Sequence, residues 1–238
     1  MSKPLVVVTG ATHGIGRAVA AAFAAEGHPL LLIARHPQPL ESVHGELIRQ
    51  VPVDVANYAA LEAAIRDAEA VHGPSECLVN SAGFLKIGKL QTRNVAELSY
   101  EVDVLFKGVM HSTLAVLPGM VARRSGTIIN VSSIADRTPG PEGEVYHASK
   151  AAVRSLGASL QKAEAANNIR VINIAPGFVK TDIHTAMGIS FEEYCHHLGN
   201  PDFISAEGLA DIIMFCWKRP QHICIRDIVV MPTSSSFG

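Results

Sequence analysis

The feature that most constrains the fold is an alternation, along the whole chain, of short apolar runs with longer segments of helical periodicity. Most of the apolar runs are continuous, which is typical of parallel strands covered on both faces. The expected strands are Leu5–Val8, Leu30–Ala34, Gln50–Val53, Glu76–Asn80, Gly126–Val131, Arg170–Ala175 and Ile225–Met231. The expected helices are Ile15–Glu26, Asn57–Val71, Val95–Val121, Val145–Ala166 and Ala206–Trp217. The pattern predicts βαβ units in an α/β fold, a doubly wound parallel sheet of about seven strands with helices on both faces.

The composition fits a single globular domain over residues 1–238. Hydrophobic residues make up 48% of the chain and charged residues 18%, a balance that argues against disorder. The formal net charge of -2 gives no reason to expect nucleic acid or an anionic membrane as partner. The first apolar run, Leu5–Val8, is too short for a signal sequence or a membrane span. We therefore expect a cytoplasmic protein without a nucleic-acid or membrane partner.

The cysteines predict neither a disulfide framework nor a metal site. Cys77, Cys195, Cys216 and Cys224 contain no Cys-x-x-Cys pair, so we expect reduced thiols. Cys195 is followed by two histidines, which could suggest a metal ligand set. Adjacent histidines on a helix point in different directions, however, and no further ligand is suitably spaced. We expect no bound metal.

A glycine-rich turn, Thr9-Gly10-Ala-Thr-His-Gly14-Ile-Gly16, lies between the first strand and the first helix. A dinucleotide pyrophosphate needs a tight turn, a backbone that it can approach closely, and a helix amino terminus whose amides face the anion. Glycines at Gly10, Gly14 and Gly16 meet these needs, although an ordinary βα turn is the alternative. A nucleoside triphosphatase loop is excluded because no Gly-Lys-Ser/Thr follows.

The spacing Gly-x-x-x-Gly-x-Gly resembles the glycine motif of the short-chain dehydrogenase/reductase family, and further motifs follow in that family's order. They are Asp54-Val55, Asn80-Ser81-Ala82-Gly83, Ser132-Ser133, Tyr146-His-Ala-Ser-Lys150 and Pro176-Gly177-Phe-Val-Lys-Thr181. The resemblance covers nearly the whole chain and implies a Rossmann-type fold that binds a nicotinamide dinucleotide. It implies cofactor contacts at Gly10, Thr12, His13, Gly14, Ile15, Gly16, Arg35, Asp54, Val55, Asn80, Ala82, Gly83, Tyr146, Lys150, Pro176, Gly177, Val179 and Thr181.

The predicted catalytic residues are Ser133, Tyr146 and Lys150. Tyr146 and Lys150 are four residues apart, so on a helix they share one face. A free tyrosine has a pKa of ~10, and we expect the neighbouring ammonium and the positive oxidised nicotinamide to lower it. Tyr146 would then exchange a proton with the substrate oxygen, and Ser133 would hydrogen-bond that oxygen. By resemblance, Lys150 also binds the nicotinamide ribose.

The end of the second expected strand predicts a preference for NADP(H) over NAD(H). An NAD site usually has Asp or Glu there, about twenty residues after the glycines, to bind the ribose 2′-hydroxyl. This chain has Ile33-Ala34-Arg35-His36, with no acid and with Arg35 placed to meet a 2′-phosphate. His13 occupies a position where NADP-using relatives often carry a basic residue. A solvated loop arginine is the alternative for Arg35.

One position departs from the family pattern. The family usually places an asparagine on the fourth helix, three residues before a glycine, where it kinks the helix and anchors a proton-relay water. Leu105 occupies that place here, before Gly108. The main prediction is an NADP(H)-dependent carbonyl reductase or alcohol dehydrogenase. The alternative is a dinucleotide-binding regulator or scaffold with little turnover, which only Leu105 favours.

The substrate and the assembly are predicted in outline. Residues 84–89, 135–144 and 182–205 should wall the site, and the third of these segments should cover the substrate. Their mixed polarity and the carboxyl-terminal residues 225–233, which lack an Asp-Gly-Gly ending, favour a small ketone or a 3-oxo or 3-hydroxy acid. A steroid or an acyl thioester stays open. By resemblance, the helices Val95–Val121 and Val145–Ala166 pair between subunits in a homodimer or homotetramer.

Overall fold

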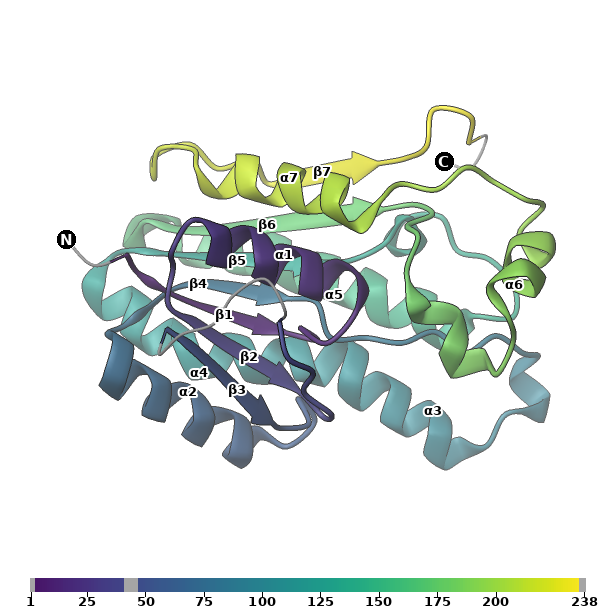
Figure 1. Ribbon diagram of the computed structural model, residues 1–238, viewed down its shortest axis with the longest axis horizontal. Coiled ribbons are helices and arrows are strands. Elements are labelled where there is room, and N and C mark those ends of the chain that lie inside the picture. The colour runs from purple at the N-terminus through teal and green to yellow at the C-terminus, as the bar shows by residue number, and fades with distance from the viewer. Residues whose placement is uncertain (1–2, 41–46, 236–238) are drawn as a thin grey trace.

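The computed structural model describes residues 3–40 and 47–235, and within them seven strands form one parallel sheet (Figure 1). The strands are β1 (Leu5–Thr9), β2 (Leu30–Ala34), β3 (Ile48–Pro52), β4 (Ser75–Asn80), β5 (Gly126–Val131), β6 (Ile169–Pro176) and β7 (Asp227–Val230). Their order is β3-β2-β1-β4-β5-β6-β7, so the winding reverses between β1 and β4. The predicted doubly wound sheet is confirmed.

Helices cover both faces of this sheet, as the sequence predicts. The α-helices are α1 (Gly14–Ala25), α2 (Tyr58–His72), α3 (Val95–Val102), α4 (Gly108–Arg123), α5 (Glu144–Ala163), α6 (Phe191–His197) and α7 (Ala206–Trp217). Short helical turns are η1 (Leu90–Thr92), η2 (Asp103–Lys107), η3 (Ile134–Asp136), η4 (Ala165–Asn167) and η5 (Asp182–Met187). The strand arrows all point toward the side where α3 and α6 lie (Figure 1).

Alternate residues of the central strands serve two separate cores. Val6 and Val8 of β1 pack into the core that includes α1 and α7. Leu5 and Val7 pack into the core that includes α2 and α4. Because both faces are buried, these strands have no polar alternation, which explains their continuous apolar sequence.

The expected helix Val95–Val121 contains a π-helical turn. α3 leads directly into η2, whose five residues are π-helical, and α4 continues from Gly108. By length and composition the segment Val95–Arg123 is apolar enough to cross a bilayer. Its apolar residues Val104, Val116 and Met120 are buried against the sheet, which accounts for that composition.

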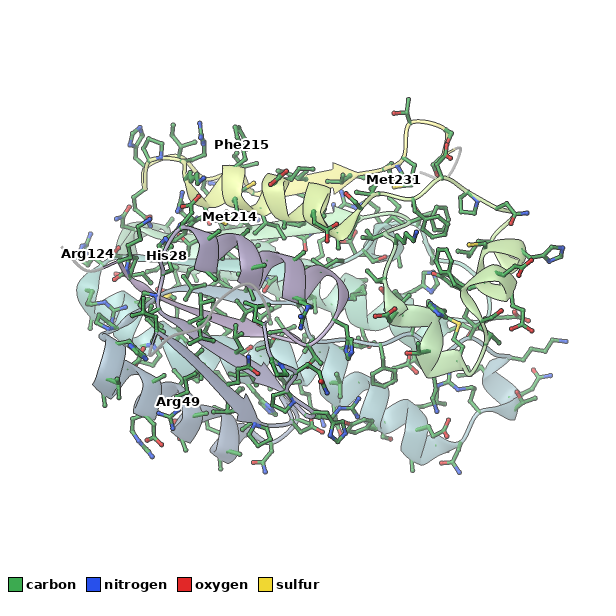
Figure 2. The ribbon with its side chains drawn as sticks, in the orientation of Figure 1. His28, Arg49, Arg124, Met214, Phe215 and Met231 are labelled. Atoms are coloured by element: carbon green, nitrogen blue, oxygen red, sulfur yellow. The ribbon has the colours of Figure 1, made fainter. Side chains whose placement is uncertain are left out.

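Helix α7 is amphipathic and lies beside α1. Met214 is buried in the core shared with α1, whereas the next residue, Phe215, is 51% exposed and points outward (Figure 2). Arg170 of β6 is only 3% exposed, and its guanidinium lies against the end of α7. Its guanidinium donates to the carbonyl oxygens of Trp217 at 3.0 Å and Arg219 at 2.8 Å. Arg170 therefore satisfies carbonyl groups that a helix end leaves without partners.

Replacing Arg170 by methionine should destabilise the fold. Arg170→Met leaves those carbonyls buried without a charged donor, and we expect the free energy of unfolding to fall by about 2–4 kcal/mol. Urea unfolding at neutral pH measures this loss. The control is Arg49→Met, because Arg49 lies on the edge strand β3 with a side chain 38% exposed (Figure 2). Equal losses in the two variants would contradict the role of Arg170.

Candidate active site

A cavity of about 520 Å³ opens at the carboxyl ends of the strands, where the winding of the sheet reverses. In doubly wound sheets this crevice is where ligands bind. Predicted cofactor residues in its lining are Gly10, Thr12, His13, Gly14, Ile15, Arg35, Asp54, Val55, Ala82, Gly83, Tyr146, Lys150 and Thr181. Phe84 and Asp182, from two of the predicted wall segments, and Ser132, from the predicted Ser132-Ser133 motif, also line it. Val53, Val104 and Val131, which the sequence did not single out for the site, line it as well.

The glycine turn forms a cradle that only glycine permits. Gly10 has a φ of +69°, and a Cβ there would lie 2.6 Å from the Cα of Ala82. A Cβ on Gly16 would lie 2.2 Å from the carbonyl oxygen of Gly10. Helix α1 starts at Gly14, and its N-cap, His13, makes no side-chain capping bond. The first amides of α1 thus remain available to an anion, so these residues fit the pyrophosphate of a dinucleotide.

At the other end of the cavity, three side chains from different elements are joined by hydrogen bonds. Arg35, after β2, donates to the hydroxyl of Tyr100 at 3.1 Å. That hydroxyl donates in turn to Oδ2 of Asp54 at 2.6 Å. The ring of Tyr100 also stacks on Phe84, with centroids 6.0 Å apart. Tyr100 was not predicted, because it lies on α3, far along the chain from both of its partners.

The predicted catalytic residues meet at the centre of the crevice. Tyr146 and Lys150 lie on α5, and Nζ of Lys150 is 5.6 Å from the centroid of the Tyr146 ring. The same Nζ donates to the carbonyl oxygen of Val131 at 2.9 Å. Ser133, the N-cap of η3, hydrogen-bonds the Tyr146 hydroxyl. The end of β5 and the first turns of α5 thus bring all three residues together.

Burial shifts the pKa values of both ionisable groups. Burial raises the pKa of Tyr146 to about 12, although the hydrogen bond from Ser133 acts in the opposite direction and lowers this pKa. Burial also lowers the pKa of Lys150 to about 8, and the charge of Asp136 partly offsets this. The expected lowering of the Tyr146 pKa is therefore not achieved by the protein alone. Desolvation dominates because it disfavours the phenolate, and the hydrogen bond from Ser133 offsets it only in part.

Comparison with known proteins identifies the family. Residues 4–189 match the family model described as short chain dehydrogenase. The chain belongs to the short-chain dehydrogenase family. An uncharacterized oxidoreductase of Staphylococcus aureus is 30% identical over 236 residues, which cover 98% of each chain.

Two solved structures extend this comparison. The closed form of a serine dehydrogenase complexed with NADP+ matches with a TM-score of 0.91 and 30% identity, over 98% of this chain and 96% of that one. Serine dehydrogenase from Escherichia coli matches with a TM-score of 0.82 and 30% identity, over 98% and 100% of the two chains. The protein is thus an oxidoreductase with the family's seven-stranded Rossmann-type fold.

Some predicted residues of this short-chain dehydrogenase lie outside the cavity lining. They are Gly16, Asn80, Ser133, Pro176, Gly177 and Val179. Asn80 is buried and donates to Oδ1 of Asn130 at 2.9 Å, so its side chain joins two strands. Val179 is buried in the core beside α7 and pairs with Ile204 in an isolated bridge. Asn80 and Val179 therefore act in the packing behind the crevice, whereas Ser133 contacts Tyr146 from the end of β5.

Leu105 lies in the π-helical turn η2 and is 1% exposed. One of its methyl carbons is 3.1 Å from the position of a Cβ on Gly83, and that position is 4.0 Å from Nζ of Lys150. Leu105 therefore places an apolar group near the lysine, where the family asparagine would place an amide. The helix nevertheless keeps its irregular turn at this position, without an asparagine side chain.

Aromatic residues of η5 and α6 gather near Tyr146. His184 stacks on Tyr194 with centroids 6.1 Å apart and meets Phe191 edge-on at 5.5 Å. Tyr194 is only 7% exposed, and its charge when ionised would raise the pKa of Tyr146. On α3, the buried Glu101 acts on Tyr146 in the same direction. Among the described residues, no group of three or more His, Cys, Asp and Glu side chains gathers to hold a metal ion.

Replacing Lys150 by methionine should stabilise the protein at neutral pH. The buried ammonium costs stability below its folded pKa of about 8, and an apolar side chain of similar size removes this cost. We expect Lys150→Met to add about 1–4 kcal/mol to the free energy of unfolding at pH 7. As the pH rises from 8 toward the unfolded lysine value, wild type loses the penalty and the difference narrows.

Thermal unfolding at pH 7 and at pH 10 measures this difference. The control is Lys162→Met, because Lys162 is exposed on the same helix. A Lys150→Met protein that melts below wild type at pH 7, or a gap that is independent of pH, would show that burial does not penalise the ammonium.

Proposed function

We propose that the protein is an NADP(H)-dependent oxidoreductase that interconverts a carbonyl and a secondary alcohol of a small substrate. The observation that carries this proposal is the convergence of Ser133, Tyr146 and Lys150 at the cavity that also holds the glycine cradle. Each of these features is common by itself. Their combination at one edge of the sheet is what carbonyl reduction requires.

In this proposal the nicotinamide cofactor, when bound, supplies or accepts the hydride. Tyr146 donates its hydroxyl proton to the carbonyl oxygen during reduction and takes it back during oxidation. Ser133, which hydrogen-bonds the Tyr146 hydroxyl, can donate to the same substrate oxygen and fix its position. Because the protein alone raises the pKa of Tyr146 to about 12, the hydroxyl is protonated and ready to act as an acid near neutral pH.

Leu105 favours a second function, a dinucleotide-binding regulator or scaffold with little turnover. Its buried methyl groups replace a polar side chain near Lys150 and offer no hydrogen bond to a relay water. The two functions differ in a measurable way. Both require NADPH binding at the glycine cradle, but only the enzyme consumes NADPH in the presence of a ketone.

Replacing Tyr146 by phenylalanine should separate binding from turnover. Tyr146→Phe removes the proton donor but keeps the ring, so we expect NADPH consumption to fall by about a hundredfold or more, since acid catalysis contributes that much. The increase in melting temperature with NADPH should persist. Tyr58→Phe is the control, because Tyr58 lies on α2, outside the cavity lining. Consumption that survives in Tyr146→Phe would remove Tyr146 from the mechanism.

The preference for NADP(H) is supported by the charge at the end of β2. Arg35 lines the cavity and is exposed there, with His36 beside it. The hydroxyl of Tyr100 occupies one guanidinium N–H of Arg35 and leaves the others for a phosphate. The neighbouring serine dehydrogenase structure is complexed with NADP+, which agrees with this preference.

An acidic side chain at position 35 should reverse this preference. Arg35→Asp removes the cation and adds a charge that repels a 2′-phosphate. We expect the ratio of NADPH to NADH affinity to fall by at least about tenfold, as the loss of one charge-assisted contact implies. Fluorescence titration with both cofactors measures this ratio. Arg49→Asp is the control, since Arg49 lies on β3 outside the cavity lining. An unchanged ratio in Arg35→Asp would rule out Arg35 as the discriminating residue.

For the substrate, we propose a small ketone or a 3-oxo or 3-hydroxy acid, covered by residues 182–205. The aromatic side chains of η5 and α6 near Tyr146 support a cover over the substrate. The two similar structures are of serine dehydrogenases, and serine is itself a 3-hydroxy acid. A panel of 3-hydroxy acids with NADP+ and of diones and ketoesters with NADPH tests this class.

We also propose a homodimer or homotetramer in the cytoplasm. On α5, Ala148, Ala151 and Ala158 are exposed, so a second copy could approach this helix closely. Gly157 of the same helix faces the sheet instead, where a Cβ would lie 3.1 Å from the amide of Asn130. Sedimentation of the purified protein would give the subunit number.

A further inference from the structure

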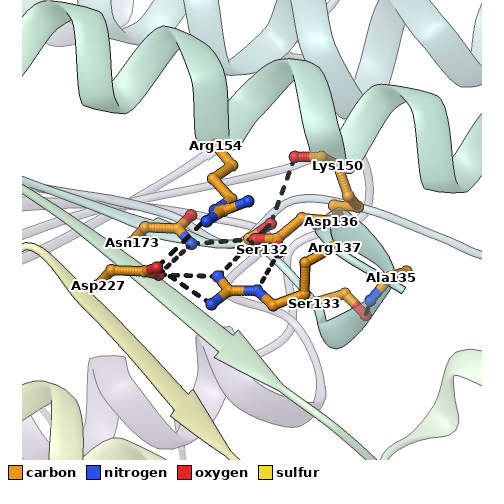
Figure 3. A network of polar contacts seen from close by, with 9 residues as sticks. All are labelled: Ser132, Ser133, Ala135, Asp136, Arg137, Lys150, Arg154, Asn173 and Asp227. Atoms are coloured by element: carbon orange, nitrogen blue, oxygen red, sulfur yellow. Dashed lines mark hydrogen bonds and ion pairs between the residues drawn. The ribbon is translucent and has the colours of Figure 1, made fainter. Parts of the chain in front are cut away.

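A buried carboxylate lies directly behind the predicted catalytic group. The side chain of Asp136, the last residue of η3, is 0% exposed. Its Oδ2 accepts hydrogen bonds from Ser132 at 2.8 Å and Asn173 at 3.0 Å, and its Oδ1 accepts one from Arg137 at 2.6 Å (Figure 3). A buried carboxylate is costly unless it is paired and fully hydrogen-bonded, and this one is both. Asp136 lies in residues 135–144, which the sequence predicts as a wall of the site, but its buried hydrogen bonds were not predicted.

This carboxylate is connected to the backbone on both sides of the crevice. The Ser132 hydroxyl, which donates to Asp136, also lies 3.5 Å from the carbonyl oxygen of Lys150. The next residue, Ser133, caps η3 by accepting a hydrogen bond from the amide of Ala135 at 3.2 Å. The end of β5, the turn η3 and helix α5 therefore meet at Asp136 (Figure 3). Displacing the carboxylate would move Ser133 relative to Tyr146 and Lys150.

A second carboxylate in the same network provides a natural comparison. Asp227 of β7 accepts from Arg137 at 2.8 Å and from Asn173 at 2.9 Å, so it shares both partners with Asp136. It is 37% exposed and also lies 3.8 Å from Arg154 of α5. The negative charge of Asp136 raises the pKa of Lys150, against the larger effect of burial, and it raises that of Tyr146. Asp227 thus matches Asp136 in its partners but lies nearer solvent.

We propose that Asp136 is a positioning residue for the reaction, which holds the Ser132–Ser133 turn against α5 and places a buried negative charge behind the Tyr146–Lys150 pair. The inference rests on the proposed function, because Asp136 acts through Ser133 and Lys150 and not on the substrate. A protonated Lys150 keeps a positive charge next to Tyr146 and offers ammonium donors inside the cavity. Without the carboxylate, burial alone would act on this lysine.

Other charged and titratable side chains surround Asp136, Lys150 and Tyr146. Within the described part of the chain, the titratable groups that face Asp136, Lys150 or Tyr146 are Arg137 next to η3, Arg154 and His147 on α5, Asp227 on β7, Glu101 on α3 and Tyr194 on α6. Asp136→Asn and Asp227→Asn each remove one carboxylate that binds Arg137, so both weaken the network. Only Asp136→Asn removes the charge that acts on Lys150.

The test follows the titration of Lys150 in the protein without ligands, by NMR of lysines labelled with ¹³C at Cε. The Lys150 signal is assigned by its absence from Lys150→Met. We expect a midpoint near pH 8 in wild type, because its pKa is about 8. The midpoint should fall by about one pH unit in Asp136→Asn. It should stay at the wild-type value in Asp227→Asn. With a substrate, the pH profile of kcat/KM should also move to lower pH in Asp136→Asn, and its maximum should fall by about 10–100-fold.

The titration decides the inference independently of turnover. An unchanged midpoint in Asp136→Asn, or an equal fall in Asp227→Asn, overturns it even if the enzyme is active. Absence of turnover with every substrate refutes the proposed function but leaves the titration readable. If Asp136→Asn does not fold, Arg137→Gln takes its place. Loss of the Arg137 cation strengthens the field of Asp136, so the midpoint of the Lys150 titration should rise above the wild-type value. A midpoint that is unchanged in Arg137→Gln overturns the inference.

Discussion

A row of polar side chains across the carboxyl end of the sheet fixes the geometry of the whole crevice. Parallel pairing aligns Thr9 with Asn80, Asn80 with Asn130, Asn130 with Asn173, and Asn173 with Asp227. Two of these pairs are joined by side-chain hydrogen bonds: Asn80 donates to Asn130 at 2.9 Å, and Asn173 donates to Asp227 at 2.9 Å. The loops of the site leave the sheet within a few residues of this row. The register of the strands therefore sets the distances between residues that are far apart in sequence.

Residues of this row also anchor the loop after β4 and helix α4 to the buried sheet by hydrogen bonds. Thr9 accepts hydrogen bonds from the amides of Ser81 and Ala82, both at 3.2 Å, and so ties the glycine turn to the loop after β4. Ser112 of α4 donates to Asn80 at 2.5 Å, which anchors the helix on that face. Buried polar groups are stable only when they are hydrogen-bonded. These bonds replace hydrogen bonds to water, which the helices on both faces of the sheet exclude.

The sequence predicted the sheet and most of the crevice because both depend on local pattern. Strands β2 and β5 have the predicted bounds, Leu30–Ala34 and Gly126–Val131. Strands β3 and β7 differ by a few residues, since both lie at sheet edges where burial is incomplete and the apolar pattern is weak. The glycine turn and the Tyr146–Lys150 pair could be predicted because the residues of each motif lie within a few positions of one another in the sequence.

The residues that were missed act across elements. Tyr100 joins Arg35 to Asp54, and Asp136 joins Ser132 to Asn173, at separations that no local pattern encodes. One signal for Asp136 was present, namely a charged residue a few positions after the end of a continuous apolar strand. Whether it was buried depended on Asn173 of β6, and thus on the strand order.

The π-helical turn η2 forms here without the asparagine that the family usually places at this position. The irregular turn is present although Leu105 replaces the asparagine, so the asparagine side chain is not what bends this helix. Close packing is visible instead at Gly108, where a Cβ would lie 2.6 Å from a methyl carbon of Val55. Gly108 therefore allows this helix to lie close to the loop after β3. What the substitution removes is a polar side chain, and the arrangement of Ser133, Tyr146 and Lys150 does not depend on it.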